Sequence, residues 1–273
     1  MRDFTCLDPP SSSVSQQARR ALVVTGRDEL RCIDDRVSLA PHHQAARAFS
    51  FLGECGEAAC ALNRMKDPSV RNRFAQLVVA HTLAAAGGRP IRYASLASGH
   101  LLMDASILSQ LTECGAQLEA VLLCDAEYAN PDGGCDSALA QLAHAFAPAK
   151  VVAFNSVPNL VEAVLRGYVS ADVTGVGTVH CVVACDAGVE ASRMLKRASS
   201  LILADGGAAL TLMNGGHAGA TTRGWLREKR PPGVSPVIPP SLDIKLAPAT
   251  NGELGLEELA LPPAGESTSG DDS

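Results

Sequence analysis

Five short apolar runs, each rich in β-branched or aliphatic side chains, form the clearest pattern along the chain. The runs do not alternate polar with apolar positions, which is typical of strands that a parallel sheet buries on both faces. Helix-like segments separate them, and this spacing is the signature of βαβ units. The predicted strands are 91–96, 118–124, 151–154, 179–184 and 201–204, and the predicted helices between them are 101–114, 135–146, 158–166 and 189–196.

This alternation predicts the fold class α/β, as a three-layer Rossmann-like domain with a mainly parallel sheet. Right-handed crossovers place the carboxyl ends of all the strands at one edge. Ligands of open α/β sheets bind at that edge, near the point where the strand order reverses. The residues that directly follow each strand are therefore the candidates for function.

Outside this region the pattern is weaker, and it divides the chain into four parts. Residues 1–40 mix serine with charge and show no sustained period, so they are predicted to be a flexible leader. Residues 41–89 are predicted to be a helical N-terminal extension, and 90–213 the Rossmann-like domain. Glycine, proline and scattered charge dominate 214–273, which is predicted to be a linker and a mostly disordered tail with one strand-like run at 242–246.

One helix of the extension has clear ends. Asp67 can cap its first amides and Pro68 fits its first turn, whereas Gly87 and Gly88 supply a left-handed stop. Its apolar positions fall on one helical face. We expect this helix to pack on the sheet.

Composition and charge narrow the classes of function. The chain has 273 residues, of which 47% are apolar and 19% charged, which suits one substantial core. Its formal net charge of −6 disfavours broad binding to nucleic acid or anionic lipid, because such binding needs clustered positive charge. No apolar run reaches the length of a membrane span, so we expect an intracellular protein without a membrane partner.

The cysteines give no local metal signature. There are nine, an odd number in a long chain, and we expect most of them to be free thiols in a reducing compartment. No CxxC pair occurs, so the sequence predicts no metal site.

Four basic residues surround a tryptophan just beyond the predicted domain. A basic patch with an aromatic side chain can hold nucleic acid. With several prolines following, a solvated linker is the simpler interpretation. The basic residues are Arg223, Arg227, Lys229 and Arg230, around Trp225.

A turn of small residues follows the first predicted strand. It runs Ser95-Leu96-Ala97-Ser98-Gly99-His100-Leu101 and opens into the first crossover helix. A ligand can approach such a backbone closely and meet the amides of a helix N-terminus. An ordinary tight turn explains the same residues equally well.

In this turn the chain resembles the class I S-adenosylmethionine-dependent methyltransferases. The first motif of that family is an acidic residue, an apolar residue and glycine-any-glycine-any-glycine, directly after the first strand. Gly99 occupies the middle glycine position, Ala97 and Leu101 occupy the outer two, and Ser95 stands where the family's acid holds the ammonium group of the cofactor. The resemblance implies S-adenosylmethionine as cofactor and Ser95, Ala97 and Gly99 as cofactor-binding residues.

Asp125 follows the second predicted strand and extends the resemblance. A carboxylate here can accept both hydroxyls of an adenosine ribose. Asp125 comes 26 residues after Gly99, where ribose-binding acids follow such a loop. The alternative is a surface acid that caps the next turn.

Two further candidates follow the third and fourth predicted strands. Within the resemblance, Asn155 contacts the adenine amino group, and Asp186 lies where the family places substrate and catalytic groups. Asp186 is therefore the catalytic candidate, able to orient or deprotonate an acceptor. Both residues can instead cap the helices that follow them.

Three functions are compatible with these residues. The first is a methyltransferase-like protein that binds S-adenosylmethionine and acts on an unidentified acceptor. The second is a catalytically inactive Rossmann-like protein that binds a cofactor or a partner. The third, a nicotinamide-dependent oxidoreductase, is disfavoured because G-x-G-x-x-G is not met at Gly99. We therefore expect a small-molecule cofactor as partner, with S-adenosylmethionine bound more tightly than NAD.

Overall fold

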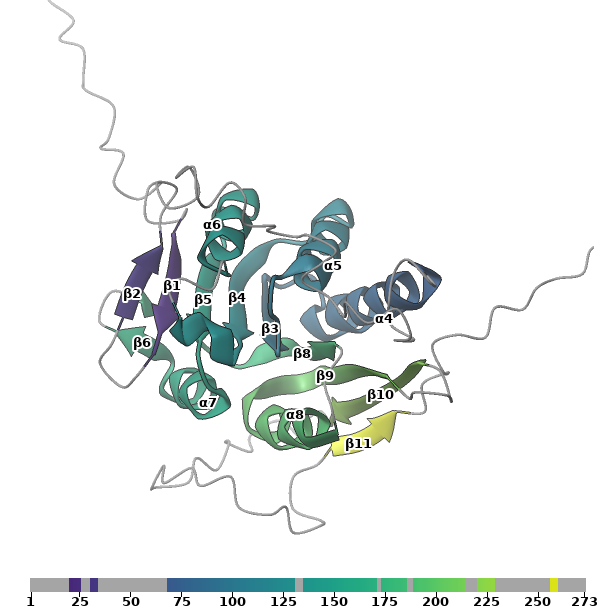
Figure 1. Ribbon diagram of the computed structural model, residues 1–273. Helices are drawn as coiled ribbons and strands as arrows, with labels where there is room; N and C mark the ends of the chain where they lie inside the picture. Colours follow the sequence, from purple (N-terminus) through teal and green to yellow (C-terminus); the bar gives the residue numbers. More distant parts are fainter. Residues whose placement is uncertain are drawn as a thin grey trace, which may run out of the picture.

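A nine-stranded, mostly parallel sheet forms the centre of the protein, with helices on both of its faces (Figure 1). The structure is a computed structural model, and it describes residues 20–25, 30–33, 68–130, 135–170, 173–185, 189–214, 220–228 and 256–259. Within these residues the predicted fold class, α/β with a three-layer Rossmann-like arrangement, is confirmed.

Five strands at the centre pair in parallel and coincide with the predicted runs. Four of them begin and end within one residue of the predicted bounds: β3 (Ile91–Leu96), β4 (Leu118–Cys124), β5 (Lys150–Phe154) and β8 (Val179–Cys185). The fifth, β9 (Leu203–Asn214), begins later than predicted because the preceding helix continues through Ile202. The residues after Ala204 therefore lie inside a strand and not in a turn at its carboxyl end.

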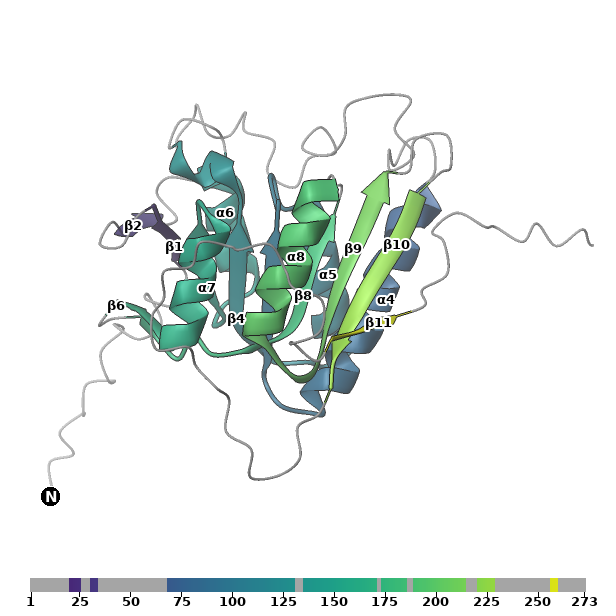
Figure 2. The same ribbon diagram turned by 90° about the horizontal axis from the view of Figure 1, so that it is seen from below.

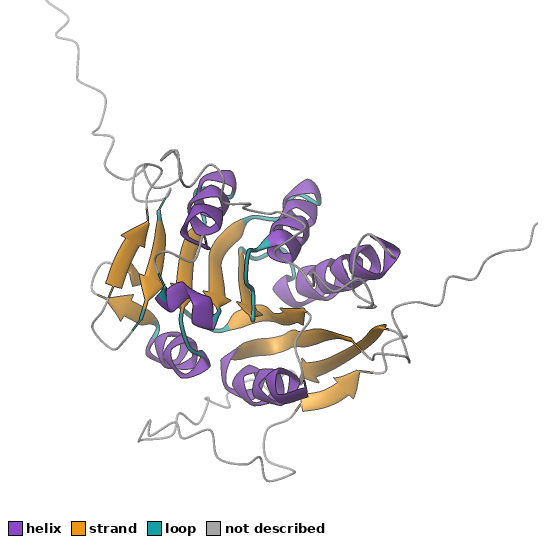
Figure 3. Ribbon diagram, in the orientation of Figure 1, coloured by secondary structure: helices purple, strands orange, loops and turns teal. Residues whose placement is uncertain are grey.

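The helices form the two outer layers. α4 (Pro68–Ala86), α5 (Leu102–Glu113) and α6 (Cys135–Ala145) cover one face of the sheet, and α7 (Val157–Arg166) and α8 (Val189–Ile202) cover the other (Figures 1 and 2). Figure 3, which colours helices and strands separately, shows the sheet between the two sets of helices. α4 packs on β8 and β9, as predicted from its apolar face.

Successive side chains of the central strands enter the two layers in turn, because neighbouring side chains of a strand point to opposite faces. Tyr93 and Val121 are buried in the layer that contains α4, α5 and α6. Ala94 and Leu122, their neighbours in β3 and β4, are buried in the layer of α7 and α8. Both faces of these strands are apolar, which explains why the runs show no polar alternation.

Two strands come from the segment predicted to be a flexible leader, so that prediction is wrong for these residues. β1 (Ala21–Val24) pairs in parallel with β5, and β2 (Leu30–Ile33) pairs antiparallel with β1. Ala21 and Val23 are fully buried in the core. A strand of four residues is too short to show a hydrophobic period, which is why the sequence pattern misses it.

Two more strands come from the segment predicted to be a linker and tail. β10 (Ala220–Arg227) pairs antiparallel with β9, and β11 (Leu256–Leu259) pairs antiparallel with β10. Trp225, predicted to lie in a solvated linker, is only 5% exposed and belongs to the core beneath α8. The Arg227 guanidinium donates to the carbonyl oxygens of Ser200 (3.2 Å) and Leu203 (2.6 Å), near the end of α8.

The remaining elements are small. A short 3₁₀ helix, η2 (Ala126–Ala129), follows β4, and β6 (Tyr168–Ser170) and β7 (Val173–Thr174) form a separate two-stranded sheet. The strand-like run at 242–246 lies outside the described residues. No helix in the described part of the chain is long and apolar enough to cross a membrane.

Candidate functional site

The strand order across the sheet is β11-β10-β9-β8-β3-β4-β5-β1-β2, and the direction in which strands are added reverses at β3. The chain passes from β3 outward through β4 and β5, and later through β8 and β9 on the other side. The carboxyl edge at such a reversal is where open α/β sheets bind ligands. Residues 97–101, which follow β3, are described there, whereas 186–188, which follow β8 and include Asp186, lie outside the described residues.

Three residues of the loop after β3 have a left-handed backbone conformation, although only one of them is glycine. Ala97, Gly99 and Leu101 have φ angles of 54°, 49° and 67°. This left-handed region is open to glycine and costs other residues about 1–2 kcal/mol. These three positions correspond to the glycines of the motif that the turn resembles. Ala97 and Leu101 thus adopt the left-handed conformation although residues other than glycine disfavour it.

Hydrogen bonds hold this loop against the segment that follows β4. The Ser98 amide donates to the carbonyl oxygen of Cys124 (3.3 Å), and the Ser98 hydroxyl lies 2.7 Å from the Tyr128 hydroxyl. Tyr128 donates to the carbonyl oxygen of Gly99 (3.1 Å). Tyr128 is fully buried, and this burial raises the pKa of its hydroxyl well above its ordinary value. The side chain therefore stays protonated and remains a donor to the loop.

Asp125 joins the same loop from the end of β4. Its Oδ2 accepts the Gly99 amide (2.9 Å) and its Oδ1 accepts the Glu127 amide (3.0 Å). The structure thus brings together the two strongest candidates of the sequence, and Asp125 also caps η2. A carboxylate has about four lone-pair sites, and Asp125 is partly exposed, so it can accept further hydrogen bonds from a ligand.

Ser95 lies deeper than the resemblance implies. It is 3% exposed and contacts Tyr93 and Asp104, both of them buried. The Tyr93 hydroxyl donates to Asp104 Oδ1 at 2.7 Å. Burial raises the pKa of Asp104 to about 6, although the hydrogen bonds from Tyr93 and Ser95 oppose the rise. Ser95 is therefore part of a buried polar cluster beneath the loop.

Asp104 and Tyr128 are the two residues of this site that sequence reasoning misses. Asp104 occupies an otherwise apolar helix face, which is a detectable signal, since a buried acid needs a partner. Tyr128 has no such signal, because an aromatic residue in a polar turn gives no indication of where its hydroxyl points.

Asn155 lies at the same edge but farther out, next to β1. Its amide group donates to the carbonyl oxygen of Thr25 (2.9 Å), and its Oδ1 accepts from the Asn159 side chain (3.0 Å). The residue at the N-cap of α7 is Ser156. Asn155 therefore connects β1 to α7 through its side chain, and its Oδ1 keeps one acceptor site.

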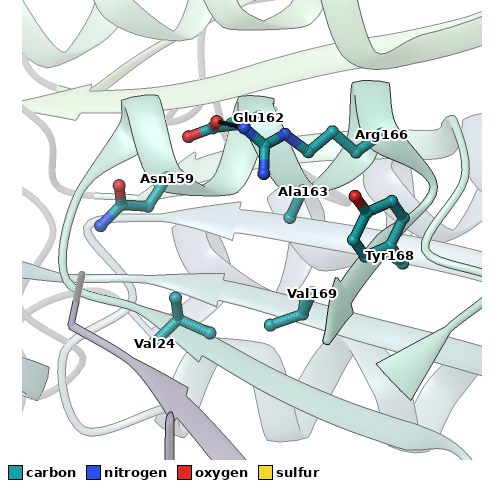
Figure 4. A pocket seen from close by; sticks show the side chains of 7 residues that line it. All are labelled: Val24, Asn159, Glu162, Ala163, Arg166, Tyr168 and Val169. Carbon is teal, nitrogen blue, oxygen red and sulfur yellow. Dashed lines mark ion pairs between the residues drawn. The ribbon is translucent and has the colours of Figure 1, made fainter. Parts of the chain in front are cut away.

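A small hollow lies between β1 and α7 (Figure 4). It encloses about 30 Å³, and Glu162 and Arg166 form an ion pair on its wall. A single water needs about 10–15 Å³ by this measure, so the hollow has room for only a few waters. It is too small for a nucleoside, and the candidate site remains the edge at Gly99 and Asp125.

Comparison with known proteins returns solved structures only. No protein-family model matches the sequence, and no curated protein matches it. One similar structure is an S-adenosylmethionine-dependent methyltransferase from Clostridium acetobutylicum, with a TM-score of 0.34, 9% identity, and coverage of 59% of this chain and 63% of that one. A second is magnesium protoporphyrin IX methyltransferase (ChlM) from Synechocystis PCC 6803 with bound SAM, with a TM-score of 0.35, 15% identity, and coverage of 66% and 73%.

A third similar structure is DesVI from Streptomyces venezuelae, with a TM-score of 0.28, 11% identity, and coverage of 59% of this chain and 63% of that one. This chain thus spans 63% of the length of the first and third proteins. The Rossmann-like assignment rests on the strand order and the parallel pairing described above.

Proposed function

We propose that this chain binds a nucleoside cofactor of the S-adenosylmethionine type and is a methyltransferase-like protein that acts on an unidentified acceptor. The observation that supports this most is the hydrogen bond between the Gly99 amide and the Asp125 carboxylate at the reversal of strand order. It fixes a left-handed loop and a partly exposed acid side by side, at the edge where such sheets bind ligands.

In this proposal Asp125 accepts the ribose hydroxyls. Each of its oxygens already accepts one backbone amide, and each keeps one further lone pair for a hydroxyl. Ala97 is exposed and carries only a methyl group, so the backbone of the loop stays open to a close ligand. Asn155 can offer its remaining acceptor site on Oδ1 to an adenine amino group.

The methyl transfer itself is a further part of the proposal. The cofactor supplies an electrophilic methyl group on a sulfonium centre. Asp186, as the proposed catalytic residue, would orient the acceptor or remove its proton.

A second candidate function, cofactor binding without methyl transfer, is favoured by the burial of Ser95. Its hydroxyl belongs to the cluster with Tyr93 and Asp104 and is 3% exposed, so Ser95 does not present an acid or a hydroxyl to a cofactor ammonium group. Asp104 is the nearest acid in that cluster, and it is 2% exposed. Loss of this charge-assisted bond, worth about 1.5–3 kcal/mol, would weaken cofactor binding by tenfold or more.

Calorimetric titration with S-adenosylmethionine, its demethylated product and NAD tests the proposal. We expect the first two to bind more tightly than NAD, and Asp125→Asn to weaken their binding at least tenfold, because it removes a charged acceptor of two hydroxyls. Glu113→Gln is the matched control, since it makes the same chemical change at an exposed residue at the far end of α5. Circular dichroism checks that both variants fold.

The outcomes separate the candidate functions. Binding of NAD alone would favour the oxidoreductase, and binding of no nucleoside would favour an interaction protein. If S-adenosylmethionine binds, a screen for transfer of a labelled methyl group distinguishes an enzyme from an inactive homologue. Asp186→Asn should abolish that transfer while leaving cofactor affinity unchanged.

A further inference from the structure

Three potential metal ligands from separate segments meet at the carboxyl edge of the sheet. His100 follows Gly99 in the loop after β3, Glu127 lies in η2, and Cys135 is the first residue of α6. One ring nitrogen of His100, one carboxylate oxygen of Glu127 and the Cys135 sulfur all lie within 4.8 Å of one another. The residues are separated by 27 and 8 positions in the sequence, so no local motif reveals them.

The separations are close to those of ligands on one tetrahedral ion. With metal–ligand bonds of about 2.0 Å to nitrogen or oxygen and about 2.3 Å to sulfur, two ligands on zinc lie about 3.3–3.6 Å apart. Cys135 Sγ and Glu127 Oε2 are already 3.5 Å apart. Since the three atoms lie within 4.8 Å of one another, the His100 ring nitrogen has to move by no more than about 1.5 Å to complete the set.

A buried ring nitrogen of His100 is a second observation at this cluster. The His100 Nδ1 is buried and has no hydrogen-bond partner among the described residues. A buried polar atom without a partner costs about 1–3 kcal/mol, and coordination of an ion by this nitrogen would remove that cost. Cys135 is fully buried as a free thiol, whereas Glu127 is exposed, so the cluster is enclosed on one side and reachable from solvent on the other.

We propose that His100, Glu127 and Cys135 form a binding site for a divalent ion that favours thiolate and imidazole ligands, with Zn²⁺ as the best fit. The sulfur and nitrogen donors select against Mg²⁺ and Ca²⁺, which take oxygen ligands. Three protein ligands leave the fourth tetrahedral position for water, as in zinc sites that are not fully closed by protein. On binding, the Cys135 thiol gives its proton to solvent and the sulfur coordinates the ion as thiolate.

Such an ion would tie together the loop after β3, η2 and the start of α6. Asp125 lies between two of the ligand-bearing segments, since its carboxylate accepts the amides of Gly99 and Glu127. None of the three metal ligands is among the proposed cofactor contacts, although His100 follows Gly99 and the Glu127 amide donates to Asp125. The metal site can therefore be tested without any nucleoside.

The test uses the full chain, reduced and stripped with a chelator, in two titrations. Zn²⁺ is titrated in competition with a chromophoric chelator, and Co²⁺ is titrated to observe the absorption band of a cobalt–thiolate bond. We expect one equivalent of each ion to bind, with Cys135→Ser removing the cobalt–thiolate band. Glu127→Gln should weaken Zn²⁺ binding at least tenfold. Because the Glu127 side chain is exposed, this variant still tests the site if Cys135→Ser does not fold.

Cys114→Ser and Glu113→Gln are the matched controls. Both residues are exposed near the end of α5, outside the cluster, and both variants should bind as the unmodified protein does. Absence of stoichiometric Zn²⁺ binding would overturn the proposal. The proposal would also be overturned if Glu127→Gln and Cys135→Ser both bound Zn²⁺ as tightly as the unmodified protein, because the ion would then sit on other groups of the chain.

Discussion

Ala97 holds a backbone conformation that alanine rarely adopts, and this has a measurable energetic effect. Its φ of 54° lies in the left-handed region, and its side chain is exposed, so it gains little from packing. We expect Ala97→Gly to raise the free energy of unfolding by about 0.5–1 kcal/mol, the strain relieved less the entropy that glycine loses on folding. Urea denaturation measures this change.

Ala80→Gly provides the opposite control for that prediction. Ala80 is exposed in the interior of α4, where glycine should lower the free energy of unfolding by about 1 kcal/mol. If both substitutions destabilise the protein equally, the loop after β3 does not have the left-handed backbone described here.

The buried carboxyl of Asp104 makes stability depend on pH. Its pKa is raised from 3.8 to about 6, so the folded protein holds this proton more tightly than the unfolded chain. The stability that this provides is complete below pH 3.8 and is lost as pH rises through about 6. Asp104→Asn cannot ionise and still accepts the Tyr93 hydrogen bond. We therefore expect its stability relative to the unmodified protein to improve by up to about 2.4 kcal/mol between pH 4 and pH 7.5.

Comparison of the two proteins, and not the pH profile of either alone, isolates this effect. Burial lowers the pKa of His81 and of His180, so both histidines destabilise the fold as pH falls below about 6.5, which opposes the effect of Asp104. These contributions are the same in both proteins and cancel in the difference. Parallel stability curves from urea denaturation would contradict the prediction.

At the scale of elements, β1 is the strand whose position most needs a test. It lies between β5 and β2, with Val23 fully buried, although its sequence surroundings predict a flexible leader. We expect Val23→Ala to lower the free energy of unfolding by about 2 kcal/mol, because it removes two buried methyl groups. Leu30→Ala in β2 is the control, since Leu30 is 41% exposed and should change stability by less than about 0.5 kcal/mol. If neither substitution changes the free energy of unfolding, this segment is not part of the core and is a flexible leader.

Strands buried on both faces could be predicted from sequence, and those at the margins of the sheet could not. β3, β4, β5 and β8 appear as mostly apolar runs because helices cover both of their faces, and their charged residues, Arg92, Glu119 and Lys150, stand at the first or second position of a strand. β10 is different, because Arg223 and Arg227 interrupt its apolar residues. Whether Trp225 is buried depends on α8, which is distant in sequence, so no local pattern could indicate it.

At the scale of the whole molecule, parallel topology explains how much of the candidate site could be predicted. The edge shared by Gly99 and Asp125 follows from the βαβ spacing alone, because every parallel strand ends on the same side. The side-chain directions do not follow from that spacing. Ser95 turns into a buried cluster with Asp104, and the Asn155 side chain donates to the carbonyl oxygen of Thr25, directly after the first strand. Both arrangements depend on contacts between segments that are distant in sequence.

The loop after β3 is held by hydrogen bonds within the protein itself, since Asp125 accepts the Gly99 amide and Tyr128 donates to the Gly99 carbonyl oxygen. A loop that is already ordered loses little conformational entropy when it binds, so affinity is determined by the contacts with the ligand and not by the cost of arranging the site. The same rigidity has a signature in the protein alone: the amide protons of Ser98 and Gly99 should exchange with solvent slowly, as they do in regular secondary structure. The candidate site would then behave as part of the sheet, with the lifetime of the sheet's own hydrogen bonds.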